Sequence, residues 1–219
     1  MARISWLFVG CIAALAVSGA GAAPAGGRPT PELKASAQER AVEHFNQGIG
    51  HRDQAWGYEE QAEKSTGEKE RKKKGDQARR EYEKAQAEQR QAIALDPAMF
   101  EAHSSLGYVQ RKLGLFADAL KSYDRALELN ADYMQAVEYR AEAHLGLNRI
   151  GEAQKAYEIL FRRDPERAAL LLLAFEIWVA QAPKGIAASE MDNVQSWIAA
   201  KEAIAREMGG TTGERQKEW

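Results

Sequence analysis

The feature that most constrains this chain is a set of residues that recur every 34 positions in its middle part. The recurring sets are Ala85, Ala119 and Ala153; Ala92, Ala126 and Leu160; and Pro97, Ala131 and Pro165. Two helices can approach closely only where a side chain is short, and proline ends one helix and starts the next. Three independent spacings of the same length weigh against helices packed without a repeat. We therefore expect an all-α solenoid of stacked helical pairs.

Two consecutive segments, 100–133 and 134–167, carry the pattern most completely. The residues that define it in the first segment are Leu106, Gly107, Ala119, Tyr123 and Ala126. In the second segment Ala141 replaces the glycine. The pattern extends over residues 38 to about 182 and resembles the tetratricopeptide repeat (TPR). This resemblance implies helix–turn–helix units in a right-handed superhelix, whose concave groove binds peptides or extended segments of partner proteins.

The first unit is longer than the others. Gly48 and Ala85 are 37 residues apart, whereas the equivalent Gly107 and Ala119 are 12 apart, so about 25 residues are inserted between two helices. Shared between two arms, they would lengthen each helix by about 18 Å. The best turn chemistry, Ser65-Thr66-Gly67, lies at the midpoint. We expect a projecting, coiled-coil-like helical hairpin with Trp56 and Tyr82 packed between its arms. A break at Gly75 is the alternative.

The first residues have the organisation of an export signal. Arg3 precedes the apolar stretch Ile4–Val17, and Ala20-Gly21-Ala22 follows as a cleavage pattern. We expect cleavage before Ala23, with Ala23-Pro24-Ala25 as a second site. An uncleaved inner-membrane anchor is an alternative, and a lipoprotein based on Cys11 is disfavoured because the apolar stretch continues past it. The sequence thus predicts a secreted protein, most simply a periplasmic one.

The end of the chain is expected to close the solenoid. Residues 190–208 carry an apolar helical stripe of Val194, Trp197, Ile198, Ile204 and Met208. The predicted divisions are a signal peptide (1–22), a flexible linker (23–36), a first TPR-like unit with its helical insertion (37–99), two TPR units (100–133 and 134–167), terminal helices forming a cap (168–208) and a loose tail (209–219).

The sequence predicts a scaffold or adaptor rather than an enzyme. It contains no nucleophile elbow, phosphate-binding loop, paired-cysteine motif or H-E-x-x-H motif. A formal net charge of -2 disfavours nucleic-acid binding. His44 and His51 lie seven residues apart on one helical face, as metal ligands can. The resemblance assigns both positions to packing residues, so we expect no metal, cofactor or small-molecule substrate.

The resemblance also implies which residues face the groove. They are Glu101, Ser104, Tyr108, Arg111 and Lys112 in the second unit, and Gln135, Glu138, Tyr139 and Glu142 in the third. Aromatic residues among hydrogen-bonding charges are typical of recognition surfaces, although an ordinary solvated helix face is the alternative. The Lys/Asn clamp with which some TPR proteins hold a C-terminal carboxylate is absent, because Phe45 and Ile49 occupy those sites.

A second candidate surface is basic. Residues 69–80 contain seven basic and two acidic side chains. The predicted anionic-surface patch consists of Lys72, Lys73, Lys74, Arg79 and Arg80. Such a patch either keeps an extended helix soluble or contacts anionic lipid, cell wall or an acidic partner. A tether acting through this patch is the alternative to the adaptor.

Overall fold

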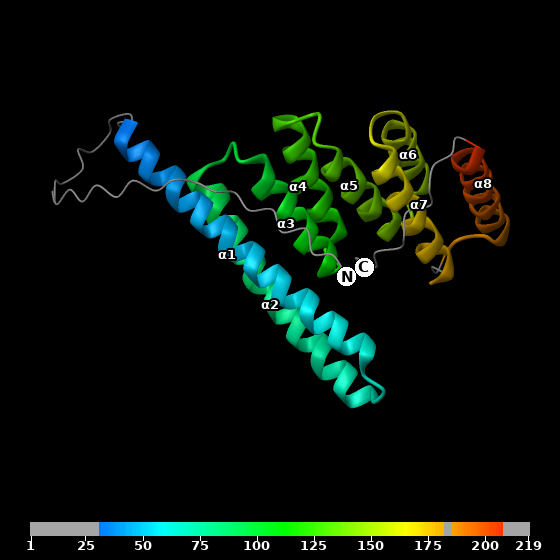
Figure 1. Cartoon of the computed structure of the whole chain (residues 1–219), viewed down its shortest axis with the longest axis horizontal. Helices are drawn as coiled ribbons and strands as arrows, with labels where there is room; N and C mark the ends of the chain where they lie inside the picture. The colour runs from blue at the N-terminus through cyan, green and yellow to red at the C-terminus, as the bar shows by residue number, and fades with distance from the viewer. Residues whose placement is uncertain (1–30, 182–184, 208–219) are drawn as a thin grey trace.

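The computed structural model describes residues 31–181 and 185–207, and over these ranges it contains eight α-helices and no strand (Figure 1). The helices are α1 (Pro31–Lys64), α2 (Glu68–Leu95), α3 (Phe100–Lys112), α4 (Phe116–Leu129), α5 (Met134–Gly146), α6 (Ile150–Arg163), α7 (Pro165–Ala180) and α8 (Ala188–Glu207). Consecutive helices pack as pairs, and each pair packs on the next along the array. The expected all-α solenoid is confirmed.

Equivalent turns join the two helices of each middle unit. Gly114 after α3 and Asn148 after α5 are 34 residues apart, and both adopt left-handed backbone angles, with φ of 78° and 56°. Glycine and asparagine are the residues that adopt this conformation most readily, and it ends a helix by turning the chain. The recurring interval therefore fixes the turns as well as the helix contacts.

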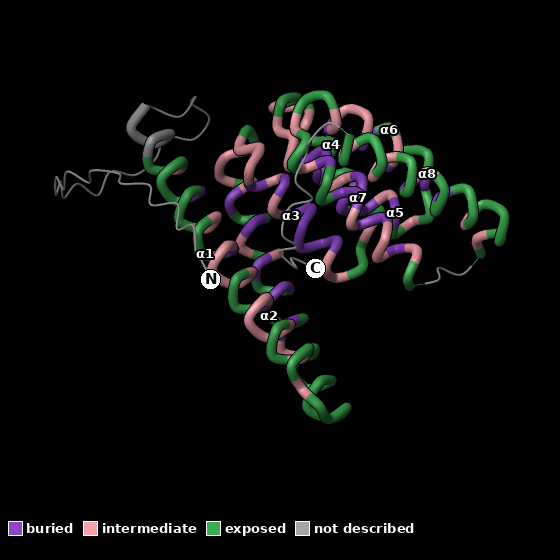
Figure 2. Tube along the Cα trace, turned by 45° about the vertical axis from the view of Figure 1, so that its right-hand side comes forward, coloured by how far each residue is buried: buried purple, intermediate pink, exposed green. Residues whose placement is uncertain are grey.

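The repeated small residues lie where helices touch. Ala85, Ala119 and Ala153 are completely buried. The ring of Tyr123 fills the space next to Gly107 and is also completely buried. Buried residues are concentrated in α3 to α7, as Figure 2 shows. The alternation of small and large side chains thus builds the core that the sequence predicted.

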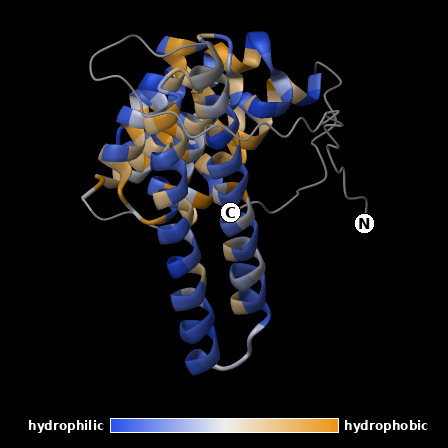
Figure 3. Ribbon diagram, turned by 90° about the vertical axis from the view of Figure 1, so that its left-hand side faces the viewer, coloured by the Kyte–Doolittle hydropathy of each residue, from blue (hydrophilic) through white to orange (hydrophobic). Residues whose placement is uncertain are grey.

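The first pair is the elongated hairpin. Its arms α1 and α2 run side by side away from the other helices, and residues 65–67 connect them as expected (Figure 1). The distal arms are mostly hydrophilic (Figure 3). Tyr82 is buried between Ala55, Ala78 and Ala85, and α2 continues through Gly75 without a break. Trp56 joins this cluster from its edge and reaches α3.

The start of α1 corrects one boundary. We expected a flexible linker over residues 23–36, but α1 begins at Pro31, so the last six of these residues are helical. Proline is favoured in the first turn of a helix, and the following Glu32, Leu33, Lys34 and Ala35 are good helix formers. The predicted signal peptide, the remainder of the linker and the tail 209–219 lie outside the described residues.

The last pair closes the array through α8. Val194 and Ile198 of α8 are buried, and Trp197 lies against the rings of Tyr157 and Phe175, at 5.1 and 4.8 Å between centroids. Ile204 of the predicted stripe is instead 40% exposed. Met208 lies outside the described residues. A C-terminal capping helix is therefore present, and its contacts with the rest of the array run from Met191 to Lys201.

Candidate interaction face

The odd-numbered helices form one side of the molecule, which we call the inner face. Successive members of the series α1, α3, α5 and α7 contact one another. The nine predicted groove residues all lie on α3 and α5. The structure buries five of them, namely Ser104, Tyr108, Arg111, Glu138 and Glu142. The half-buried ones are Glu101, Lys112, Gln135 and Tyr139.

The buried members are covered by their neighbours on the inner face. The indole Nε1 of Trp56 donates a hydrogen bond of 2.6 Å to the hydroxyl of Tyr108, and the two rings meet edge to face. The Tyr108 ring also contacts Tyr139, with 5.3 Å between centroids. The guanidinium of Arg111 lies 5.1 Å from one of these tyrosine rings and 5.5 Å from the other. Burial raises the pKa of the Tyr108 hydroxyl well above its ordinary value. These residues are a packed layer between helices.

Two buried ion pairs connect α3, α5 and α7. Arg111 lies 2.5 Å from a carboxylate oxygen of Glu142, and Arg167 lies 2.6 Å from one of Glu138. Burial raises the pKa of Glu142 to about 8 and that of Glu138 to about 6, although the arginines oppose both shifts. A buried pair of this kind contributes little net stability when intact, but losing one partner leaves an uncompensated charge. The pairs therefore fix how these three helices fit together.

The long arm α1 is tied to the same face. The ammonium of Lys112 lies 2.9 Å from a carboxylate oxygen of Glu59, which also accepts a 3.0 Å hydrogen bond from Tyr82. Arg52 stacks on the Trp56 ring, 4.4 Å from its centroid, and pairs with the neighbouring Asp53 at 2.8 Å. The inserted helix thus supplies part of the layer.

Sequence reasoning missed four members of this layer: Arg52, Trp56 as a partner of Tyr108, Glu59 and Arg167. The spacing of the first three is a usable signal, since positions 52, 56 and 59 continue one face of α1 at helical intervals. Arg167 lies at the start of α7, next to the helix-capping Asp164, and its reach back to α5 has no sequence signal.

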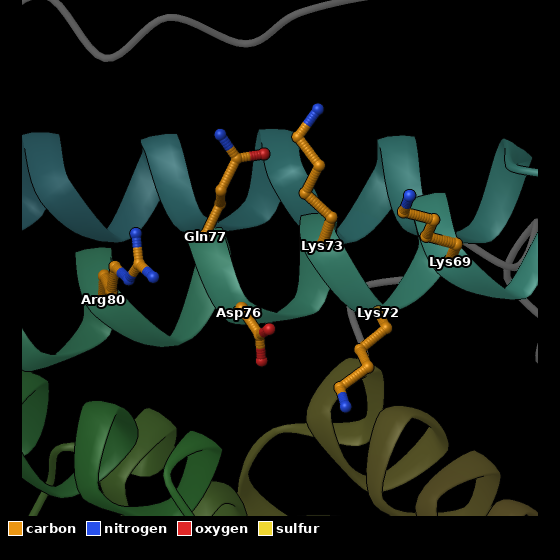
Figure 4. A pocket seen from close by; sticks show the side chains of 6 residues that line it. All are labelled: Lys69, Lys72, Lys73, Asp76, Gln77 and Arg80. Atoms are coloured by element: carbon orange, nitrogen blue, oxygen red, sulfur yellow. The ribbon is translucent and has the colours of Figure 1, made fainter.

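The predicted basic patch divides into different environments. A shallow hollow along α2 is lined by Lys69, Lys72, Lys73, Asp76, Gln77 and Arg80 (Figure 4). Three predicted residues are in it: Lys72, Lys73 and Arg80. Lys74 instead stacks over Tyr58 of α1 at 5.4 Å. Arg79 pairs with Glu83 at 3.2 Å. Lys73 pairs in the same way with Glu70 at 3.6 Å, so the predicted residues lie in several environments along α2.

Two of the histidines link the arms of the hairpin. His44 pairs with Glu88 and His51 with Glu81, each with 2.7 Å between nitrogen and oxygen. Within the residues that the structure describes, no cluster of three or more His, Cys, Asp or Glu side chains is arranged to hold a metal ion. In the same residues, every helix is too short or too polar to cross a membrane.

Two segments of the chain match family models described as tetratricopeptide repeat, at residues 100–133 and 139–174. The chain folds as a TPR-type solenoid. The first match coincides with the pair α3 and α4, and the second runs from α5 through α6 into α7. Among solved structures, the first TPR of Spaghetti (RPAP3), bound to the HSP90 peptide SRMEEVD, is similar to this chain. It is 20% identical with a TM-score of 0.43, over 64% of this chain and 96% of that one.

Proposed function

We propose that this protein is a non-enzymatic adaptor of the cell envelope that binds a segment of another protein on its inner face. The observation that carries the proposal is the TPR-type array, which brings the half-buried Glu101, Gln135 and Tyr139 together with the α1 arm on one side of the molecule. Aromatic rings beside hydrogen-bonding charges suit protein recognition. The buried ion pairs beneath give this surface a fixed shape, which lowers the entropy lost on binding.

A pair of photo-crosslinking positions tests the proposal. Val42 on the inner side of α1 is 47% exposed, and Leu115 between α3 and α4 is 44% exposed. Each is replaced by benzoylphenylalanine in the otherwise native chain, which is then irradiated in envelope extracts. A partner protein crosslinked from position 42 and not from 115, which also binds the purified chain, is the expected result. Equal crosslinking from both positions, or none from either, would refute the proposal.

The envelope part of the proposal is supported by the predicted signal peptide. Cell fractionation with N-terminal sequencing tests it, and we expect a periplasmic chain that begins at Ala23. An intact N-terminus in the inner-membrane fraction would instead support the anchored alternative. A chain with an intact N-terminus in the cytoplasm would contradict export.

A second candidate function is a tether that binds an anionic lipid or cell-wall surface through α2. The exposed row Lys69, Lys72, Lys73 and Arg80 on a projecting arm favours it. Its test is flotation with phosphatidylglycerol vesicles and sedimentation with sacculi. The double variant K72Q/R80Q should lose this binding, whereas K121Q, which changes an exposed position of α4, should keep it. Equal binding by all three proteins would count against the tether.

A further inference from the structure

The inner side of α1 carries an apolar row without a partner among the described residues. Val42, Phe45 and Ile49 share the helix face of Trp56, at intervals of three, four and seven residues. Val42 is 47% exposed and the other two are half-buried. None of the three belongs to the three hydrophobic clusters of the core, whereas Trp56 is packed against one of them. The row therefore offers apolar surface beside the packed layer.

The charges around this row are unbalanced towards acid. Four basic side chains of the inner face are paired within the described residues: Arg52 with Asp53, Lys112 with Glu59, Arg111 with Glu142, and Arg167 with Glu138. Two further carboxylates, Glu63 and Glu101, have no ion pair in the part of the chain that the structure describes. Glu63 lies two turns beyond Trp56 on the same face of α1, and Glu101 is in the first turn of α3.

The aromatic rings of the inner face add to its attraction for positive charge. Tyr139 and Tyr133 are half-buried, and Tyr133 contacts Phe100 with 5.0 Å between centroids. Aromatic faces attract cations, and the inner face already uses this attraction internally, at Arg52 and Arg111. Burial and the nearby Glu101 raise the pKa of the Tyr133 hydroxyl, so this ring and the carboxylate are electrostatic neighbours.

We propose that the segment bound on the inner face is a cationic one, in which apolar side chains for the α1 row are flanked by lysine or arginine. This inference rests on the function proposed above and names the chemistry of its partner. An acidic segment would meet unpaired carboxylates, while the four basic side chains named above already have carboxylate partners. A neutral polar segment would leave the apolar row uncovered.

A two-by-two set of labelled twelve-residue peptides tests the proposal by fluorescence anisotropy on the purified mature chain. The peptides combine either leucine or serine with either lysine or glutamate at alternating positions. The leucine–lysine peptide should bind most tightly. Its affinity should fall about fivefold or more between 50 and 300 mM salt, because exposed charges are screened.

Matched variants locate that binding. V42S and E101Q change the inner face, and each should weaken the leucine–lysine peptide about two- to fivefold, the range of single exposed contacts. L115S and E128Q change side chains of comparable type outside this face and should have no effect. Circular dichroism is the control for folding. All four variants should remain folded, because none of them removes a fully buried group.

The outcomes separate this inference from the function on which it rests. If the leucine–glutamate or serine–glutamate peptide binds at least as tightly and is weakened by V42S, the face binds segments but the cationic preference is wrong. If V42S and E101Q leave the leucine–lysine peptide unchanged, the inference is also wrong, whatever the crosslinking from position 42 shows. If the natural occupant proves to be the α2 arm of a second copy, K72Q/R80Q should abolish this self-association. A separate partner protein is then excluded.

Discussion

Adding one methyl group at Gly107 should destabilise this protein, although alanine is the better helix former. A Cβ atom at this position would lie 2.7 Å from Cε1 of Tyr123, 2.8 Å from Cδ1 and 2.9 Å from Cζ. Carbon atoms in contact prefer about 3.5–4.0 Å, so the ring would have to move by about 1 Å. Tyr123 is completely buried in the cluster formed by α4 and α5 next to Gly107 of α3, so its ring is surrounded by packed side chains.

The size of the effect follows from two opposing contributions. Overfilling a packed core costs about 1–3 kcal/mol, while replacing glycine by alanine inside a helix gains up to about 1 kcal/mol. Because three ring atoms are crowded at once, we expect G107A to lose about 1–2 kcal/mol. Gly75 in α2 has no atom within 4 Å of the same added methyl. G75A should therefore gain about 0.5–1 kcal/mol.

Thermal unfolding followed by circular dichroism compares the two variants. For a chain of this size, 1 kcal/mol corresponds to about 2–4 °C. G107A should melt below the wild type and G75A above it, separated by about 3–12 °C. In a Tyr123→Leu background the effect of G107A should shrink, because the crowded ring is gone. A G107A chain as stable as the wild type, or an equal fall in G75A, would show that close helix approach at the repeat glycine is not what the core requires.

Two further predictions concern the ion-pair layer and the cap. Glu142 has a pKa of about 8 in the fold against 4.5 for the ordinary side chain, so its protonated form stabilises the fold at low pH and this contribution is lost as the pH rises towards 8. Between pH 5 and 9, denaturant titrations should show the wild type losing more stability than E142Q; parallel losses in both proteins would contradict the assignment. Removing the Trp197 ring by W197A should loosen α8 and speed proteolysis within residues 188–207 severalfold, with Q195A as the exposed control; unchanged cleavage would mean that these ring contacts do not hold the cap.

The repeat and the long hairpin were predictable because both depend only on counting. The 34-residue interval identifies Gly107, Ala119 and Tyr123 as positions where helices pack closely. The difference between 37 and 12 residues gives the length of the insertion directly. The turn at residues 65–67 follows from the midpoint of that insertion. Both the repeat spacing and the residues typical of turns can be read directly from a single sequence.

The state of the candidate face was not predictable in the same way. The register assigns Tyr108 and Glu142 to a helix face, but it does not say how deeply neighbouring helices interlock. That depth depends on Trp56 and Glu59, which come from an insertion that has no equivalent in the other units. The beginning of α1 was missed for another reason: Pro24, Pro29 and Pro31 indicated a flexible segment, whereas the last of them is at a position where a helix accepts proline.

The charged contacts that join α3, α5 and α7 have a consequence for how this array comes apart. When the last helical pair separates from the array, Glu138 loses its partner Arg167. When the next pair separates, Arg111 loses its partner Glu142. While the rest of the face still shields that side chain from water, its charge has lost its partner and is not fully hydrated, which is unfavourable. Solenoids held only by neighbouring contacts can fray from their ends unit by unit. In this protein, the buried ion pairs make half-opened states unfavourable. The amide hydrogens in the middle of the molecule should therefore exchange with solvent as one block.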